Sequence, residues 1–301
     1  LRSGWSATVE DYAIAGHWAW NGQVFVAGDA AGGVFGFDGR SGKTIWSQTS
    51  AHEVGLLAMA IRPDTQVITT AGQDGKVRFW DARDGQLNQT IDLGSGWIEN
   101  LTWSSNGQFL AISNSRRVHV YTADGVEHWQ SEDHPSTVSA IAWSKSEELA
   151  TACYGQVAFF NGATGEVNQR LQWKGSLVSM ALSPDGDIVA CGSQDNSVHF
   201  WRRSSGQDSM MSGYPGKPSA LAFDDSGTLL ATGGGEAVTV WSFSGDGPEG
   251  TRPGVLETHV ESVTSLTFSP RTTRLASGAR DGSVAIWNLG NDGNGRGIGA
   301  A

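Results

Sequence analysis

Cysteine, charge and long apolar runs are all scarce in this chain of 301 residues. Two cysteines, Cys153 and Cys191, are too few for a disulfide framework, so we expect buried structural thiols. No apolar run approaches the roughly 18 residues that a membrane helix needs. The 31 acidic residues outnumber the 20 basic ones, which argues against a general affinity for nucleic acid.

Glycine and tryptophan are abundant instead, with 41 and 13 residues. Seven times, an aromatic residue closes a short apolar strand. The seven closing aromatics are Phe37, Trp80, Tyr121, Phe160, Trp201, Trp241 and Trp287. They follow one another at intervals of 39–46 residues, and a period of that size indicates repeated structural units. Gly-rich turns between short aromatic strands predict an all-β repeat protein.

Each unit reads as four short strands, and the fifth unit shows the pattern most clearly. Residues 166–172 form an expected outer strand of the preceding sheet, and residues 177–182 form the inner strand of the next one. Residues 187–193 and 197–201 supply its second and third strands, joined by a tight turn. The other inner strands, which mix small residues with one large one, are expected at 56–61, 138–143, 220–223 and 263–268.

This organisation predicts a seven-bladed β-propeller with four-stranded blades, formed as one domain by residues 1–289. The repeats end near residues 38, 81, 122, 161, 202, 242 and 288. The Gly-rich tail, residues 290–301, is expected to be flexible rather than a strand. Residues 5–9 are expected to pair with the seventh sheet in its place, so that the N-terminal strand closes the ring.

Two units carry a fuller motif, in residues 51–81 (AHEVGLLAMAIRPDTQVITTAGQDGKVRFWD) and 258–288 (THVESVTSLTFSPRTTRLASGARDGSVAIWN). With these residues the chain resembles the WD40-repeat family. The resemblance implies that a loop His, a strand Ser or Thr, a turn Asp and the closing Trp form a buried hydrogen-bonded tetrad. The two implied tetrads are His52, Thr70, Asp74 and Trp80, and His259, Ser277, Asp281 and Trp287.

The tetrad pattern weakens in the other units. In the fifth unit Asp195 and Trp201 remain, but Cys191 replaces the hydroxyl. The fourth unit keeps His134, with Tyr154 in the place of the Asp. The first, third and sixth units keep neither the loop His nor the turn Asp. We therefore expect those blades to depend more on apolar packing.

Catalytic and metal-binding motifs do not stand out. His52, His134 and His259 occupy matching positions in three different units, which spreads them apart and favours a structural role over a metal site. The sequence contains no HExxH motif, no CxxC pair and no GxSxG elbow. We expect no enzyme activity, no metal and no cofactor.

One segment favours an alternative. Residues 38–46 (DGRSGKTIW) are similar to the DxxTGxxxW motif of quinoprotein propellers, which bind pyrroloquinoline quinone (PQQ). That resemblance implies a PQQ-type dehydrogenase or another propeller that binds a small molecule. A Gly-containing turn followed by an outer-strand Trp is also a good hairpin in its own right.

In WD40 proteins, partners commonly meet the face around the mouth of the channel. The positions that this resemblance places there are Gln73, Trp97, Glu99, Gln194, Lys217, Arg280 and Trp18. Trp97 is the most informative, because aromatic residues often dominate binding energy, although it could also fold back over a neighbouring blade. Residues 243–255 form a Gly- and Pro-rich insertion that offers a second candidate surface.

The favoured function is a non-enzymatic scaffold that presents a rigid face to a protein or peptide partner. We expect an intracellular, cytoplasmic protein that is monomeric by itself, with no nucleic-acid or membrane partner. A further alternative is a WD40 module of a longer polypeptide.

Overall fold

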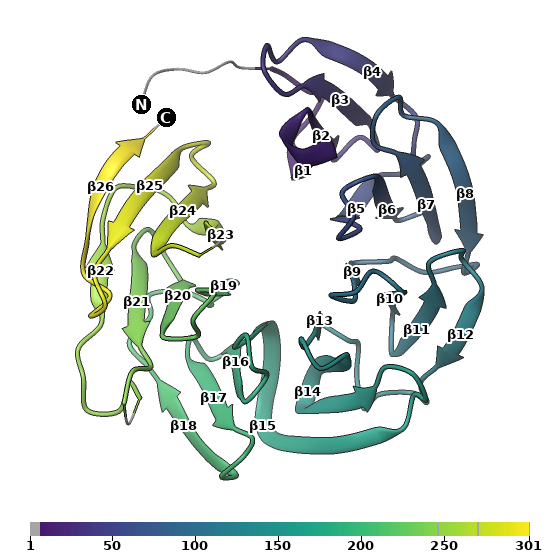
Figure 1. Ribbon diagram of the computed structural model, residues 1–301. Coiled ribbons are helices and arrows are strands. Elements are labelled where there is room, and N and C mark those ends of the chain that lie inside the picture. Colours follow the sequence, from purple (N-terminus) through teal and green to yellow (C-terminus); the bar gives the residue numbers. More distant parts are fainter. Residues whose placement is uncertain (1–6, 246, 270, 301) are drawn as a thin grey trace. The chain divides into compact units, whose positions relative to one another are not determined.

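The computed structural model describes residues 7–245, 247–269 and 271–300 (Figure 1). The chain divides into two compact units. The first unit contains the residues up to 143 together with 160–167, and the second contains 144–159 and the residues from 168 onward. In the described part of the chain, no helix is long and apolar enough to cross a membrane.

Three four-stranded sheets lie in the first unit, and consecutive strands pair antiparallel. The first sheet contains β1 (Ala13–Ala19), β2 (Val24–Asp29), β3 (Val34–Asp38) and β4 (Thr44–Gln48), with the 3-10 turn η1 (Trp20–Gly22) after β1. The second contains β5 (Leu56–Ile61), β6 (Val67–Gly72), β7 (Lys76–Asp81) and β8 (Leu87–Asp92). The third contains β9 (Asn100–Trp103), β10 (Phe109–Asn114), β11 (Arg117–Thr122) and β12 (Glu127–Gln130).

A six-stranded sheet follows along the chain, and two four-stranded sheets complete the fold. The six-stranded sheet contains β13 (Ala140–Trp143), β14 (Glu148–Asn161), β15 (Val167–Leu182), β16 (Ile188–Ser193), β17 (Val198–Arg202) and β18 (Gln207–Met211). The next contains β19 (Ala220–Phe223), β20 (Leu229–Gly233), β21 (Val238–Ser242) and β22 (Gly254–Leu256). The last contains β23 (Val263–Phe268), β24 (Arg274–Ala279), β25 (Val284–Leu289) and β26 (Gly295–Ala300).

The prediction of seven four-stranded blades is wrong, because the described strands form six sheets, and one of these has six strands. The fourth and fifth repeats share one sheet. β14 runs without a break through Tyr154 and Gly155, where a turn between two separate strands was expected. β15 likewise runs through Lys174 and Gly175 without a break, where two separate strands were expected.

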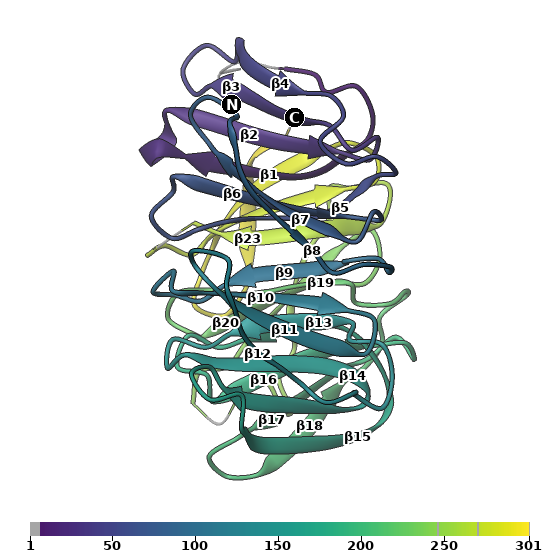
Figure 2. The ribbon, with the colours of Figure 1, turned by 90° about the vertical axis from the view of Figure 1, so that its right-hand side faces the viewer.

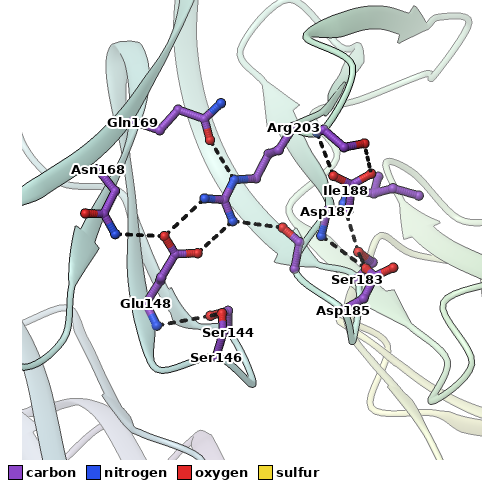
Figure 3. A network of polar contacts seen from close by, with 12 residues as sticks. Ser144, Ser146, Glu148, Asn168, Gln169, Ser183, Asp185, Asp187, Ile188 and Arg203 are labelled. Atoms are coloured by element: carbon purple, nitrogen blue, oxygen red, sulfur yellow. Dashed lines mark hydrogen bonds and ion pairs between the residues drawn. The ribbon is translucent and has the colours of Figure 1, made fainter.

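A polar network in the second unit joins the strands of the six-stranded sheet (Figure 3). The Arg203 guanidinium binds both carboxylate oxygens of Glu148, at 2.9 and 3.2 Å, and donates to Gln169 Oε1 at 2.8 Å. Asn168 donates to Glu148 at 2.9 Å. The Arg203 guanidinium also lies 3.7 Å from the ring centroid of Phe159. One arginine therefore connects β14, β15 and the end of β17.

The C-terminal tail also differs from its prediction. Residues 295–300 are strand β26, whose register pairs Trp287 with Gly297 and Leu289 with Gly295. Backbone pairing needs no side chain, and glycine allows close packing: a Cβ at Gly295 would lie 2.4 Å from Leu289 Cδ2. The expected closing strand at 5–9 lies partly outside the described residues, and its described part, residues 7–9, is not a strand. β26 fills the outer position of the last sheet.

The inner strands follow the predicted pattern of small residues with one large one. In the first unit β1, β5, β9 and β13 lie side by side (Figure 1). The closing aromatic Trp80 is buried in the apolar core between β1, β2, β5 and β6, and Trp287 is buried in the core of the last two sheets. Cys153 and Cys191 are buried free thiols, as expected.

Candidate functional site

The four residues of the second repeat's expected tetrad are joined by hydrogen bonds. Trp80 Nε1 donates to Thr70 Oγ1 at 2.8 Å, and Thr70 Oγ1 lies 2.8 Å from His52 Nε2. His52 Nδ1 lies 3.0 Å from Asp74 Oδ1. A consistent proton order runs from the indole to the hydroxyl, from the hydroxyl to Nε2, and from Nδ1–H to the carboxylate. The imidazole is then neutral and fully bonded.

Arg78 is an additional member of this network that the sequence pattern does not indicate. Its NH1 donates to Asp74 Oδ2 at 2.8 Å, and the two side chains are 12% and 5% exposed. Burial raises the pKa of Asp74, but the hydrogen bonds from His52 and Arg78 outweigh it and lower the pKa to about 2. Burial lowers the pKa of His52. The site therefore holds an ionised carboxylate beside a neutral imidazole.

In the seventh repeat a serine separates the histidine from the aspartate. Trp287 Nε1 donates to Ser277 Oγ at 2.9 Å, and that hydroxyl lies 2.7 Å from His259 Nε2. His259 Nδ1, however, lies 2.6 Å from Ser283 Oγ, which donates to Asp281 Oδ1 at 2.5 Å. The direct distance from His259 Nδ1 to Asp281 Oδ1 is 4.0 Å. Ser283 stands two residues after the aspartate, where the second repeat has Lys76.

The sixth repeat has a polar network that was not expected. The Tyr214 hydroxyl lies 2.8 Å from Thr232 Oγ1 and accepts a hydrogen bond of 2.8 Å from Trp241 Nε1. The Tyr214 phenol thus bonds to the strand hydroxyl, as the loop histidine does in the second repeat. It also accepts the hydrogen bond from the indole, which the strand hydroxyl accepts in the second repeat. The sequence signal is a tyrosine 18 residues before Thr232, the same spacing as His52 to Thr70.

We predict that Tyr214→Phe lowers the free energy of unfolding by about 2 kcal/mol, because the buried Thr232 hydroxyl and the half-buried indole of Trp241 lose a partner. The measurement is urea denaturation. Tyr12→Phe is the control, since Tyr12 is 60% exposed and should be unaffected. Equal stability of the Tyr214→Phe variant and the parent would show that this repeat relies on apolar packing alone.

In the fifth repeat, where Cys191 replaces the hydroxyl, aromatic stacking takes the place of the tetrad. The buried His199 ring stacks on Trp173 with centroids 3.7 Å apart and meets the edge of Trp201 at 4.2 Å. Neither ring nitrogen has a hydrogen-bond partner among the described residues, although Asp208 Oδ2 lies 3.2 Å from Nε2. Burial lowers the pKa of His199.

In the quinoprotein-like segment at 38–46, the side chain of Asp38 holds a turn and Trp46 packs against a neighbouring sheet. Asp38 Oδ1 accepts hydrogen bonds from the Ser41 hydroxyl and backbone amide, which fixes the β3–β4 turn. The Trp46 indole donates to the carbonyl of Ala82 at 3.3 Å and rests on Gly85 of the next sheet. Trp129 docks in the same way, with its indole on the carbonyl of Gly162 at 2.8 Å. These tryptophans join adjacent sheets.

Several residues of the predicted partner face meet at one end of the first unit's strands. The β8–β9 connection lies against the β6–β7 turn, because Leu93 N donates to Gly75 O and Ile98 N donates to Gly72 O. This places Gln73, Trp97 and Glu99 together, with Trp97 58% exposed. Trp18 does not join them: it lies beside η1 and packs edge-on against Phe25 at 5.0 Å. In Figure 2 η1 and the β8–β9 connection are at opposite ends of the strands.

The remaining predicted face residues belong to the second unit. Gln194, Lys217 and Arg280 are exposed. Lys217 precedes Pro218, whose carbonyl accepts a 2.6 Å hydrogen bond from Ser179. The insertion at 243–255 is held by an ion pair between Arg202 and Glu249 at 2.9 Å and by the buried ring of Phe243. It covers part of a pocket of about 230 Å³ that includes Met210 and Trp241.

The three tetrad-position histidines have structural partners rather than metal geometry. His134 Nδ1 lies 3.0 Å from the carbonyl of Arg116, which belongs to the preceding repeat, while His52 and His259 are engaged as described. Within the described ranges, no three His, Cys, Asp or Glu side chains gather as they would around a metal ion.

Two family models match parts of the chain. The model described as "WD domain, G-beta repeat" matches residues 165–202 and 250–288. The model described as "Outer membrane protein assembly factor BamB" matches residues 30–176. The crystal structure of the computationally designed Ika8 protein superposes with a TM-score of 0.82 at 21% identity, covering 97% of this chain and 87% of that one. This likeness concerns the fold.

Named relatives are distant in sequence. Actin-interacting protein 1 of Caenorhabditis elegans is 27% identical and matches 79% of this chain, but the chain spans only 40% of that protein. Target of rapamycin complex subunit wat1 of Schizosaccharomyces pombe is 24% identical, and the match covers 74% of each protein. Two stretches of the chain thus match the WD40 repeat model, and these relatives and the hydrogen-bonded tetrads show that the chain is similar to WD40-repeat proteins.

Proposed function

We propose that this protein is a non-enzymatic platform that binds a protein or peptide partner through the strand end carrying Trp97. The names of two relatives, an actin-interacting protein and a subunit of a complex, support a role in assembly. The preorganised tetrads support it as well, because a rigid surface loses little entropy on docking. The intracellular location expected from the sequence stays a prediction.

A row of exposed apolar side chains carries this proposal. Tyr12, Val54 and Trp97 are 60%, 64% and 58% exposed. The backbone connects their positions: Ala30 N donates to Tyr12 O, and Gly55, next to Val54, lies close to Ala30 O. Gln73 N donates to Gly55 O, and Ile98 N donates to Gly72 O. Exposed aromatic and apolar residues that line one edge in this way are typical of binding surfaces.

Charge indicates the kind of partner that fits this row. Glu53 stands beside Val54 and Glu99 lies two residues after Trp97, and both are exposed. A segment that carries apolar side chains flanked by Lys or Arg would complement the row in shape and charge. We therefore propose a partner with such a segment.

The test compares capture of partners by the immobilised parent protein and by the Trp97→Ala variant. We predict that the variant retains less than a tenth of the partner that the parent binds, because large aromatics dominate interface energy. Val126→Ala is the matched control, since Val126 is 60% exposed but lies in the β11–β12 turn at the other strand end. Unchanged capture by Trp97→Ala, with its melting temperature intact, would refute the proposed surface.

A further inference from the structure

A pocket of about 800 Å³ opens in the first unit at the strand end away from Trp97. Three turns form it: η1 between β1 and β2, the β3–β4 turn and the β7–β8 turn. Its lining residues are Trp20, Gln23, Val24, Asp38, Arg40, Ile45 and Arg83. The volume is typical of sites for small organic ligands.

One wall of the pocket is a backbone turn held in an unusual conformation. Trp20 and Asn21 have φ values of 48° and 52°, in the left-handed region that non-glycine residues seldom occupy. Hydrogen bonds hold the turn in place: Trp20 N donates to Thr65 O at 2.9 Å, and Gly39 N donates to Gln23 O at 2.7 Å. Such local strain persists only where the surroundings enforce it, and it is often found at ligand sites.

The pocket presents cationic groups that form no ion pair. Arg83 lies over the Trp20 ring, with its guanidinium carbon 5.7 Å from the centroid. Across the described ranges, neither Arg40 nor Arg83 is in an ion pair with a carboxylate. Asp38, the acidic lining residue, already accepts hydrogen bonds from Ser41 and from the backbone of Arg40. The Arg40 charge also helps to lower the pKa of Asp38, after the hydrogen bonds from Ser41, so the pocket lining has two guanidinium groups and one carboxylate.

The pocket lining also includes a buried hydrogen-bond donor, the Trp20 indole. The Trp20 indole Nε1 is buried and has no hydrogen-bond partner among the described residues. Buried N–H groups are almost always bonded, so this one marks the Trp20 ring, which lines the pocket, as an unusual group. Apolar surface for the body of a ligand is present too, on Val24 and on Ile45, which is 48% exposed.

We propose that this pocket binds an organic anion whose carboxylate or phosphate group lies between Arg40 and Arg83 and whose flat apolar body packs against Trp20 and Ile45. Guanidinium groups bind both kinds of anion through paired hydrogen bonds. The site is separate from the proposed partner surface, so either proposal can fail without the other.

The experiment follows the indole N–H signal of Trp20 in the full chain by NMR, assigned with the Trp20→Phe variant. The probes are benzoate, phenyl phosphate, inorganic phosphate and neutral benzyl alcohol. We expect benzoate, phenyl phosphate or both to shift the Trp20 signal in a saturable way, because the ring of the probe packs against the indole, and the better anion identifies the preferred head group. Inorganic phosphate should bind at least tenfold more weakly than phenyl phosphate.

Variants make the test specific. Replacing both Arg40 and Arg83 by Gln should weaken binding of the better probe at least tenfold, while Arg117→Gln, which removes a charge from an exposed ion pair of the same unit, should not change it. Both pocket arginines are exposed, so the double variant should fold normally. No saturable shift with either aromatic anion, equal binding of benzyl alcohol, or unchanged binding by the double variant would overturn the proposal.

Discussion

Asp74→Ala should lower the free energy of unfolding by about 3 kcal/mol, because the half-buried Arg78 guanidinium and the buried His52 imidazole lose the carboxylate that both contact. The Asp74 carboxylate bonds to His52 and Arg78 and accepts a backbone hydrogen bond from Lys76 at 3.2 Å. The Arg78 side chain is only 12% exposed, so water replaces the lost carboxylate poorly. Denaturant unfolding of parent and variant measures the loss.

The seventh repeat supplies the matched control. In Asp281→Ala the His259 ring keeps its bonds to Ser277 and Ser283. What is lost is the acceptor for the Ser283 hydroxyl and for the backbone amides of Val260 and Ser283, in hydrogen bonds that are exposed. We expect a clearly smaller loss than for Asp74→Ala. Equal losses in the two variants would mean that the direct His52–Asp74–Arg78 contact adds nothing to the strength of the network.

The same network gives a pH dependence with a definite sign. The folded pKa of Asp74 is about 2, below the unfolded value of about 3.9, so its stabilisation is present above about pH 4 and is lost as the pH falls through about 2. Burial lowers the pKa of His52, so stability also falls when the pH drops below about 6.5 and the unfolded imidazole takes up a proton. In the Asp74→Ala variant, the free energy of unfolding should therefore depend less on pH below pH 4.

Arg203→Met should give the second large effect, a loss of about 2–3 kcal/mol in the free energy of unfolding. This is less than the loss expected when one partner of a completely buried ion pair is removed, because the Arg203 and Glu148 side chains are partly exposed. Methionine keeps much of the apolar contact with Phe159 but leaves the Glu148 carboxylate, whose side chain is 20% exposed, without its cation. Burial raises the pKa of Glu148, but the bonds from Arg203 and Asn168 outweigh it and lower the pKa. The variant should therefore lose part of the acid-sensitive stability that the parent shows below about pH 4.5.

A surface ion pair provides the comparison for Arg203. Arg117 and Asp133 are 2.6 Å apart, but their side chains are 48% and 49% exposed. Arg117→Met should leave stability almost unchanged, because exposed pairs contribute little. If thermal unfolding shows the same small change for both methionine variants, the network of Figure 3 does not stabilise the six-stranded sheet.

The sequence predicts strands better than it predicts where sheets begin and end. The inner strand at 56–61 is found with its expected bounds, because the alternation of small and large residues is local. β15 runs without a break through Lys174 and Gly175, and no local signal in the sequence indicates that the two expected strands form one. β26 was missed because its glycines have low strand propensity, yet its backbone pairs with β25, with one register shift between Ile286 and Trp287.

The residues of the polar networks were likewise predicted only in part from the sequence. The family pattern indicates His52 and Asp74, but it does not include Arg78. The ion pair between Arg78 and Asp74 became evident only from the structure. In the sixth repeat Tyr214 occupies the place of the loop histidine and bonds to the closing Trp241. In the seventh repeat Ser283, and not the aspartate, bonds directly to the histidine Nδ1. Partner residues are harder still, since Trp18 satisfies the same compositional argument as Trp97 but lies at the other strand end.

Site-specific photo-crosslinking tests the proposed platform most directly. An aromatic photoreactive side chain, which keeps a large ring at position 97, is placed at Val54, at Trp97 or at Val126 in the full chain, and adducts formed in lysate of the source cells are identified by mass spectrometry. The account predicts the same protein adduct from positions 54 and 97 and none of it from position 126. An adduct that forms at position 126 but at neither of the other two would contradict it.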